Sequence, residues 1–332
     1  MRRLIFATQK VDPDDSVLAA TVPMVAALAA RVDELVVLCD VAVPAGLPAN
    51  VRFHEFGAAT QGQRGAKFIA ALGRELRPRP LGVVAHMIPL YVVLAAPLVR
   101  PARIPLVLWY THWKGHTVVR LAEKLATDIL SVDRRSFPLS SPKVRGIGHG
   151  IDLREFECAD GPGAEGPVRA LVLGRYSPAK GLETILRGAA RAGGVQLEIH
   201  GSDETYVAHK RELVRLAAEL GLDADLGGPV LRGDISRLFA ESHVLINNME
   251  PGAADKVVYE AAASCLPVLA SSPIFDDLLP DELRFDRDDP ESLAVRLRSL
   301  DRRRRPELRE HVLGHHSVER WADGVLATVE RR

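Results

Sequence analysis

Cysteine is scarce in this sequence. Cys39, Cys158 and Cys265 are the only three, and they stand far apart without Cys-x-x-Cys spacing. A sparse and odd count excludes the disulfide framework of small secreted domains, and no Cys/His cluster with metal-ligand spacing is present. We therefore expect reduced thiols and a cytoplasmic protein.

The sequence also lacks an excess of charge and a long apolar run. Lys+Arg and Asp+Glu balance at 43 each, so no global field favours a nucleic-acid partner, and we interpret the run Arg302 to Arg305 as a solvated face between two helices. The longest apolar stretch, Met87 to Val99, contains two prolines and is too short to span a bilayer. It is a candidate for a buried helix or for peripheral membrane contact. The brief apolar run at Leu4 to Ala7 predicts a first strand rather than a signal peptide.

Several catalytic signatures are missing as well. The sequence contains no P-loop, no Gly-x-Ser-x-Gly, and no Gly-x-Gly-x-x-Gly between an expected strand and an expected helix. These absences disfavour dehydrogenase, kinase and hydrolase functions.

What the sequence does contain is a regular alternation of short apolar runs with helical patterns over 332 residues, a length that suits two domains. Expected strands are Leu4 to Ala7, Glu34 to Cys39, Val51 to Phe56, Leu81 to His86, Pro105 to Trp109, Asp128 to Val132, Lys143 to Ile147, Val168 to Leu173, Gln196 to His200, Val244 to Asn247 and Pro267 to Ala270. Expected helices are Ser16 to Ala30, Gln63 to Leu76, Pro89 to Val99, Val118 to Ala126, Leu182 to Arg191, Lys210 to Leu220, Asp234 to Glu241, Lys256 to Ala263, Asp289 to Leu300 and Ser317 to Val329. The alternation predicts an α/β protein with two Rossmann-like, doubly wound parallel sheets.

The Gly/Pro-rich stretch Asp160 to Pro167 is the best candidate for a domain boundary. We predict an N-terminal domain over 1–160, a C-terminal domain over 161–316 and a C-terminal helix over 317–332. A cleft is expected between the two domains, and the final helix is a candidate to pack back on the N-terminal domain.

The first candidate site follows the strand that ends at Leu173. A glycine, Gly174, leads into a loop that carries Arg175 and Lys180 before the next helix. Ligands of open α/β sheets bind at the carboxyl ends of strands, and a guanidinium with an ammonium group suits a diphosphate. A solvated loop with two surface cations is the alternative.

The second candidate site follows the strand Val244 to Asn247. A loop of small residues leads into a helix whose first turn starts near Gly252 to Asp255, and free N–H groups at a helix start form an anion site. Glu260 on the same helix is placed to accept hydrogen bonds from sugar or ribose hydroxyls. The alternative makes Asp255 an N-cap and Glu260 an exposed helical residue.

Two further candidates lie in the first half. His112 and His116 follow the strand that ends at Trp109, and a histidine there can donate to a substrate hydroxyl or phosphate, although a loop histidine is the alternative. His149 and Gly150 form a turn that could present backbone amides to the cleft.

Three Asp-x-Asp spacings raise the question of a metal ion. They are Asp12 with Asp14, Asp223 with Asp225, and Asp286 with Asp288. Paired carboxylates can hold Mg²⁺ against a diphosphate, but the second pair is expected to end a helix and the third to precede one. Capping and solvation explain these two pairs better, so we expect no metal site.

Taken together, these motifs resemble the retaining nucleotide-sugar glycosyltransferases of GT-B fold, specifically glycosyltransferase family 4. The resemblance covers most of the second half and is thinner in the first. The matching segments are Leu173 to Gly181, Asp255 to Ala270, Ser317 to Val329, Trp109 to His116, and His149 to Asp152 with Phe156.

The resemblance implies a role for each candidate residue. Arg175 and Lys180 would clamp the donor diphosphate and stabilise the charge on the leaving nucleoside diphosphate. Donor binding would also involve Gly174, Glu250, Gly252 and the amides around Ala253 and Ala254, while Glu260 would hold the ribose. His112 would touch the transferred sugar, and His116, His149 and Gly150 are additional candidates. The family needs no metal and no cofactor.

The sequence departs from the family pattern at two positions. The first of the family's paired glutamates falls on Gly252, so Glu250 would need a shifted loop to take its place. Asp255 stands where the family has a small residue, and its carboxylate would repel a diphosphate unless it is turned into a cap.

We therefore expect a cytoplasmic, metal-independent, hexosyltransferase-like enzyme that uses a UDP- or GDP-sugar and a small-molecule, glycan or lipid-linked acceptor. A sugar-nucleotide-binding protein with weakened catalysis and a sugar-nucleotide epimerase are the alternatives. The donor sugar and the acceptor stay open.

Overall fold

The computed structural model describes residues 1–15, 18–44 and 46–331. The chain forms two compact units, each with its own parallel sheet. Unit 1 comprises Met1–Gly150 and the C-terminal segment from His315, and unit 2 comprises Ile151–Gly314. The first stretch of unit 1 therefore ends at Gly150, ten residues before the boundary that the Gly/Pro-rich stretch suggested, because Ile151 to Phe156 already pack with unit 2.

The sheet of unit 1 has seven parallel strands in the order β5-β3-β1-β6-β7-β8-β9. Their bounds are β1 Arg3–Ala7, β3 Glu34–Cys39, β5 Val51–Glu55, β6 Val83–His86, β7 Leu106–Trp109, β8 Asp128–Ser131 and β9 Val144–Gly146. A separate pair is formed by β2 (Lys10–Val11) and β4 (Val41–Ala42). Most of these strands are buried from end to end, as expected for a parallel sheet covered on both faces.

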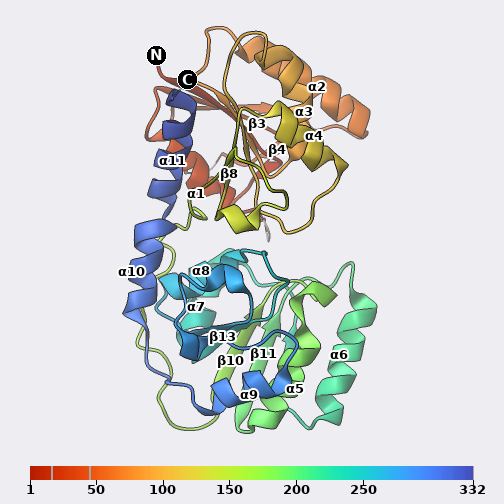
Figure 1. The fold of residues 1–332 in the computed structure, drawn as a ribbon, viewed down its shortest axis with the longest axis vertical. Coiled ribbons are helices and arrows are strands. Elements are labelled where there is room, and N and C mark those ends of the chain that lie inside the picture. The colour runs from red at the N-terminus through yellow and green to blue at the C-terminus, as the bar shows by residue number, and fades with distance from the viewer. Residues whose placement is uncertain (16–17, 45, 332) are drawn as a thin grey trace. The chain divides into compact units, whose positions relative to one another are not determined.

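Helices cover both faces of this sheet (Figure 1). One face packs against α2 (Gln61–Glu75), α3 (Pro89–Val99) and α4 (Thr117–Leu125). The other face packs against α1 (Thr21–Ala29) and α11 (Val318–Glu330). Trp321 of α11 is fully buried, with its ring centroid 6.3 Å from that of Phe6 in β1, so the C-terminal helix packs back on the N-terminal unit as predicted.

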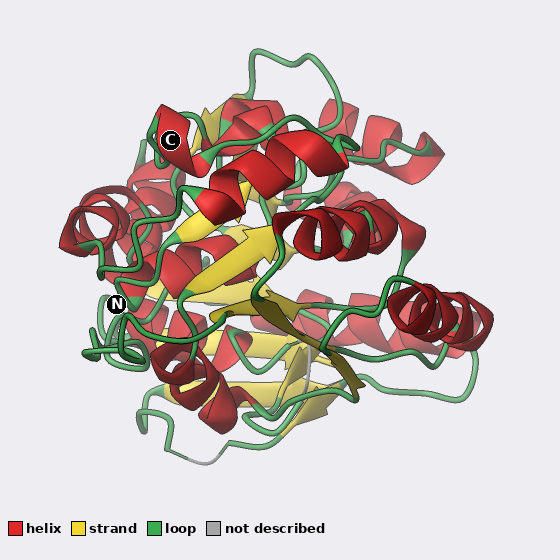
Figure 2. Cartoon of the chain, turned by 90° about the horizontal axis from the view of Figure 1, so that it is seen from below, coloured by secondary structure: helices red, strands yellow, loops and turns green. Residues whose placement is uncertain are grey.

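The sheet of unit 2 has five parallel strands in the order β12-β11-β10-β13-β14. Their bounds are β10 Val168–Leu173, β11 Val195–His200, β12 Ala224–Gly227, β13 Val244–Asn247 and β14 Val268–Ala270. The helices are α5 Leu182–Ala192, α6 Val207–Glu219, α7 Arg232–Glu241, α8 Lys256–Ala263, α9 Pro290–Arg298 and α10 Pro306–His315, the last running into unit 1. Helices α5 and α9 pack against each other and α6 lies beside α5, while Figure 2 shows the yellow strands between red helices.

Short 3-10 helices complete the secondary structure of the described residues: η1 Arg134–Ser136, η2 Pro178–Lys180, η3 Pro273–Phe275 and η4 Asp281–Leu283. Within these residues, no helix combines the length and the apolarity that crossing a bilayer requires.

Two sequence-based predictions need correction, and one helix was not predicted. The expected helix from Ser16 to Ala30 begins only at Thr21, and its first two predicted residues lie outside the described part of the chain. Asp223 and Asp225 do not end a helix: α6 stops at Glu219, and Asp225 lies in the edge strand β12. Helix α10 directly follows the run of arginines and has no strong apolar periodicity in the sequence.

The expectation of three reduced thiols is also wrong. Cys158 and Cys265 form a disulfide, with their Cα atoms 5.2 Å apart, and 107 positions separate them in the sequence. The fold brings Cys158 against Cys265, which lies just after the end of α8. The spacing of the cysteines in the sequence does not reveal this contact. Cys39 is a free, fully buried thiol, and burial raises its pKa to about 12.

Candidate functional site

The strand order of unit 2 changes direction between β10 and β13. Strand β10 is followed in sequence by its neighbour on one side, β11, whereas β13 lies on its other side. Loops leave a doubly wound sheet in opposite directions at such a point, and ligands bind in the crevice at the carboxyl ends of the strands. The two candidate loops of this unit leave from these two strands.

Lys180 reaches from the loop after β10 toward the loop after β13. Its side chain is 11% exposed, and its ammonium group forms an ion pair with Asp255 and donates to the Leu173 carbonyl oxygen at 3.3 Å. Gly174 makes this possible, because a Cβ at that position would overlap the end of the Lys180 side chain, and its φ of +137° is unfavourable for other residues. Arg175, next to this glycine, is exposed to solvent.

Asp255 occupies the N-cap position of α8, but its side chain does not cap the helix. The carboxylate instead accepts from Lys180 and, at 2.7 Å, from the side-chain amide of Asn247 at the end of β13. Both donors approach the same oxygen, Oδ2. The alternative that placed Asp255 at the N-cap is therefore correct for its position, but the carboxylate pairs with a cation across the switch point instead of capping the helix.

Glu260 is 4% exposed on α8, which excludes the alternative of an exposed helical residue. Its carboxylate pairs at 3.0 Å with Arg232, the first residue of α7, and the same guanidinium lies 2.6 Å from Glu155. The guanidinium also lies over the ring of Phe156, 5.4 Å from the centroid. Desolvation raises the pKa of Glu155, although Arg232 opposes this shift.

Lys256 is a further charged group beside this cluster. Burial lowers its pKa to about 8, and the nearby carboxylate of Glu260 only partly offsets that effect. A lysine with this pKa is partly neutral at physiological pH.

The loop between β13 and α8 holds the remaining donor-site candidates. Glu250 pairs at 3.0 Å with Arg287, and the Ala253 N–H donates to the Glu250 carbonyl oxygen at 3.1 Å. Gly252 between them has a φ of +81°, while Ala253 and Ala254 are nearly buried.

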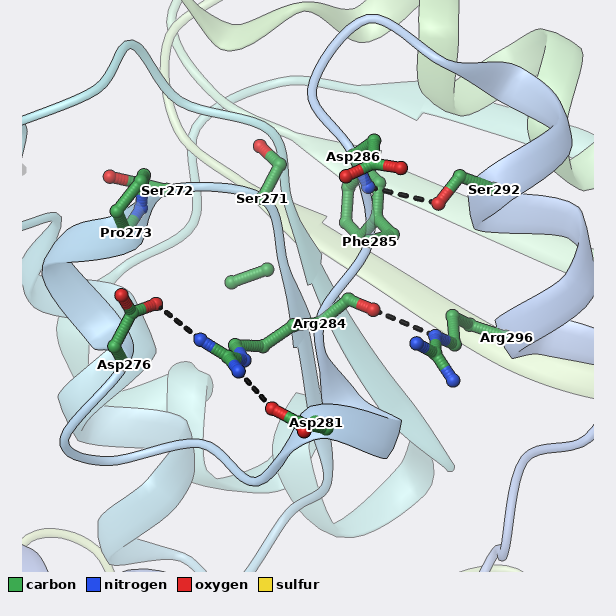
Figure 3. Close-up of a pocket in the computed structure, with 11 residues that line it drawn as sticks. Ser271, Ser272, Pro273, Asp276, Asp281, Arg284, Phe285, Asp286, Ser292 and Arg296 are labelled. Atoms are coloured by element: carbon green, nitrogen blue, oxygen red, sulfur yellow. Dashed lines mark hydrogen bonds and ion pairs between the residues drawn. The ribbon is translucent and has the colours of Figure 1, made fainter.

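A cavity of about 490 Å³ lies at the carboxyl end of the neighbouring strand, β14. Figure 3 shows the Arg284 guanidinium between Asp276 and Asp281, with the Arg296 guanidinium 2.7 Å from the Arg284 carbonyl oxygen. None of the predicted site residues lines this cavity. The two aspartates already neutralise Arg284, so we do not assign the donor site to it.

The candidates of the first half all belong to unit 1. His112 accepts from the Lys114 N–H at 3.0 Å through Nδ1, and His116 is the exposed N-cap residue of α4. His149 is 5% exposed, with its ring centroid 6.1 Å from that of Trp109, and the Gly150 N–H donates to the His316 carbonyl oxygen at 3.0 Å.

In two of the three Asp-x-Asp pairs, one carboxylate pairs with a cationic side chain. Asp12 pairs with Lys10 at 2.9 Å, and Asp288 lies 3.0 Å from Arg287. Among the described residues, no group of three or more His, Cys, Asp or Glu side chains is arranged to hold a metal ion.

Solved structures resemble this chain over its whole length. Sucrose-phosphate synthase from Thermosynechococcus elongatus matches with a TM-score of 0.81 and 16% identity, covering 100% of this chain and 99% of the other. This chain has the GT-B fold. No family model matches the sequence, and no curated protein is significantly similar to it.

Other GT-B structures match to a similar extent. A glycosyltransferase from Rickettsia africae matches with a TM-score of 0.76 and 11% identity, covering 99% of this chain and 98% of the other. HepE from Anabaena, solved in complex with UDP-glucose, has a TM-score of 0.70 and 17% identity, covering 100% of this chain and 98% of the other. At these identities the likeness shows the fold alone.

Sequence reasoning missed four residues whose side chains contact the candidate residues or their partners: Glu155, Arg232, Asn247 and Arg287. Because Asn247 ends a predicted strand, the sequence already indicated that this residue lies at the carboxyl edge of the sheet. Arg232 precedes the expected start of its helix at Asp234, and its two partners are 28 and 77 positions away.

Proposed function

We propose that the protein is a retaining, metal-independent glycosyltransferase that moves a sugar from a nucleoside-diphosphate sugar to an acceptor hydroxyl. The observation that carries this proposal is the placement of Lys180, with Arg175 in the same loop, at the switch point of unit 2 beside the start of α8. Cations and a helix N-terminus at one sheet edge suit a diphosphate. The resemblance to family 4 and the GT-B fold support the same assignment.

In the proposed reaction the bond between the sugar C1 and the β-phosphate oxygen breaks. The acceptor oxygen forms its bond to C1 on the same face, and the acceptor proton passes to an oxygen of the departing phosphate. No protein nucleophile and no cofactor are needed. Arg175 and Lys180 stabilise the charge on the leaving group, Glu260 accepts from the ribose hydroxyls, and His112 contacts the transferred sugar.

The donor is a UDP- or GDP-sugar. The complex of HepE with UDP-glucose favours the uridine nucleotide as the first to test. The acceptor is a small molecule, a glycan or a lipid-linked sugar. We keep the cytoplasm as the proposed location, although the disulfide between Cys158 and Cys265 removes the reduced-thiol argument for it.

A thermal-shift panel of UDP- and GDP-sugars tests donor binding, because a ligand that binds the native state raises the unfolding temperature by mass action. Release of nucleoside diphosphate with a panel of acceptors then tests transfer. Absence of a shift with every nucleotide and nucleotide sugar would contradict the proposal.

A catalytically weakened sugar-nucleotide-binding protein is the second candidate. Two observations favour it: Gly252 lacks the carboxylate of the family pattern, and Lys180 is already paired with Asp255. Binding without donor hydrolysis or transfer would support this candidate, whereas conversion of the donor sugar without an acceptor would indicate an epimerase.

A further inference from the structure

The ion pair between Lys180 and Asp255 has a consequence for ligand choice. We propose that Asp255 is a specificity-determining residue that favours the sugar-bearing donor over the free nucleoside diphosphate, so that the site releases its product. This inference rests on the proposed function and adds a charge selectivity that the function alone does not require.

The position of the carboxylate is fixed by its surroundings. Asp255 is 21% exposed, and its Oδ2 accepts from the Lys180 ammonium group and from Asn247 at 2.7 Å. Lys180 is held in turn by the Leu173 carbonyl oxygen at 3.3 Å. The two charges therefore face the switch point as a pair with no net charge.

The two other carboxylates of the donor-site candidates have partners of their own. Glu250 pairs with Arg287, and Glu260 pairs with Arg232. Asp255 is thus the acidic group whose partner is the very cation proposed to bind the diphosphate. Removing its charge changes the net charge beside Lys180 by one unit and leaves the other two pairs in place.

The donor and the product differ by about one charge at the β-phosphate. In a nucleoside-diphosphate sugar this phosphate is joined to the sugar by an ester bond and to the α-phosphate by an anhydride bond, so it carries a single negative charge. After transfer it is a terminal phosphate whose second ionisation lies near pH 6, so it carries about two charges at about pH 8. A lysine whose charge is balanced by Asp255 attracts the additional charge less than an unpaired lysine would, so Asp255 weakens product binding more than donor binding.

The test uses two matched ligand pairs, UDP with UDP-glucose and GDP with GDP-mannose. Their dissociation constants are measured by calorimetry at about pH 8, with a chelator present so that no divalent cation masks the charges. In Asp255→Asn the side chain keeps an oxygen acceptor but loses its charge. We expect this variant to bind the nucleoside diphosphate about tenfold more tightly, with the nucleotide sugar changing by less than about threefold.

Asp223→Asn is the matched control, because Asp223 is an exposed carboxylate of the same unit outside the site. It should leave both dissociation constants unchanged. If Asp255→Asn binds both ligands more tightly by the same factor, the carboxylate merely repels all anions and the inference is overturned. If the variant binds both ligands more weakly, the carboxylate serves to position Lys180, which also overturns the inference. If the wild type binds neither ligand, the proposed function fails together with the inference.

A measurement on the wild type alone tests the proposal even if Asp255→Asn does not fold. The β-methyl ester of UDP carries the donor's charge without its sugar. We expect the wild type to bind UDP no more tightly than this ester, because the paired lysine offers little additional attraction for the second phosphate charge. Tighter binding of UDP than of its ester would contradict the proposed selectivity.

Discussion

Arg232 and Glu260 form a 3.0 Å ion pair in which the carboxylate side chain is only 5% exposed. The guanidinium side chain is 17% exposed and has a second partner in Glu155. Charges withdrawn from water in this way depend on each other, because either one left alone lies in a medium that solvates it poorly. Helices α7 and α8 are joined by this contact close to the proposed donor site.

Replacing Arg232 with Met should destabilise the protein by about 3–5 kcal/mol, because Glu260 then remains as an uncompensated buried charge. Urea unfolding measures the loss. The double variant R232M/E260Q should recover much of it, since the unpaired carboxylate is gone. Additive effects of the two substitutions would show that the pair makes no energetic contribution.

The same pair allows a test of the ribose contact. E260Q should weaken UDP binding but leave 2′,3′-dideoxy-UDP unaffected, because the dideoxy ligand lacks the hydroxyls that donate to the carboxylate. Calorimetry on both ligands separates this role from a general loss of structure, which would weaken both to the same degree.

Removing the cations of the first loop should abolish transfer. We expect R175A and K180A each to lower turnover by about 100-fold, because each removes a group that stabilises charge on the leaving diphosphate. Steady-state kinetics with the donor identified by thermal shift measures the effect. R215A, at an exposed position on α6, serves as the control, and undiminished turnover in K180A would count against the proposed site.

His243 should make stability fall in mild acid. The side chain is 2% exposed, its Nδ1 accepts from the Arg169 N–H at 2.9 Å, and its Nε2–H donates to the Gly163 carbonyl oxygen at 2.8 Å. Burial lowers its pKa from 6.5, so below about pH 6.5 the unfolded state takes up a proton that the native state does not. The unfolding free energy should therefore be intact above this pH and decline below it.

The check is a series of thermal melts between about pH 7 and pH 5. H243N keeps an oxygen that accepts from Arg169 and cannot be protonated in this range, so its melting temperature should depend less on pH than that of the wild type. Identical pH profiles would assign the acid sensitivity to other groups.

The disulfide should stabilise unit 2. C158S should lower the unfolding free energy by about 2–4 kcal/mol, because the bond closes a long loop in the unfolded chain. Reductant should lower the stability of the wild type and leave that of C158S unchanged. In denaturant without reductant, thiol titration should find one reactive group, Cys39, and three after reduction; three groups without reductant would contradict the pairing.

The sequence predicts the continuously apolar elements well. Strands β10 and β13 and helices α3 and α8 begin and end where their patterns predict, because most of their residues are buried. Strand β12 was missed, since it is a half-exposed edge strand of only four residues that includes Asp225. So short a segment carries neither an apolar run nor an alternation long enough to predict a strand.

The loops of the candidate site were predicted, but their contacts were not. Lys180 and Asp255 are 75 positions apart, and each has a plausible local role as a surface cation or a helix cap. Their pairing depends on β10 and β13 being neighbours in the sheet. The pairing of Arg232 with Glu260 also depends on the fold, because the two residues lie on successive helices, α7 and α8, that the fold brings into contact.

Unit 1 is completed only by the last part of the chain, because α11 buries Trp321 against β1. During synthesis the first 150 residues must therefore wait, with the part of their sheet that α11 covers still exposed, until the whole of unit 2 has left the ribosome. We infer that chaperone dependence would be greatest in this interval. Cleavage between Ile151 and Cys158, or between Cys265 and Gly314, would leave the two parts of this core without a covalent link, whereas a cut between the two cysteines would leave them joined by the disulfide.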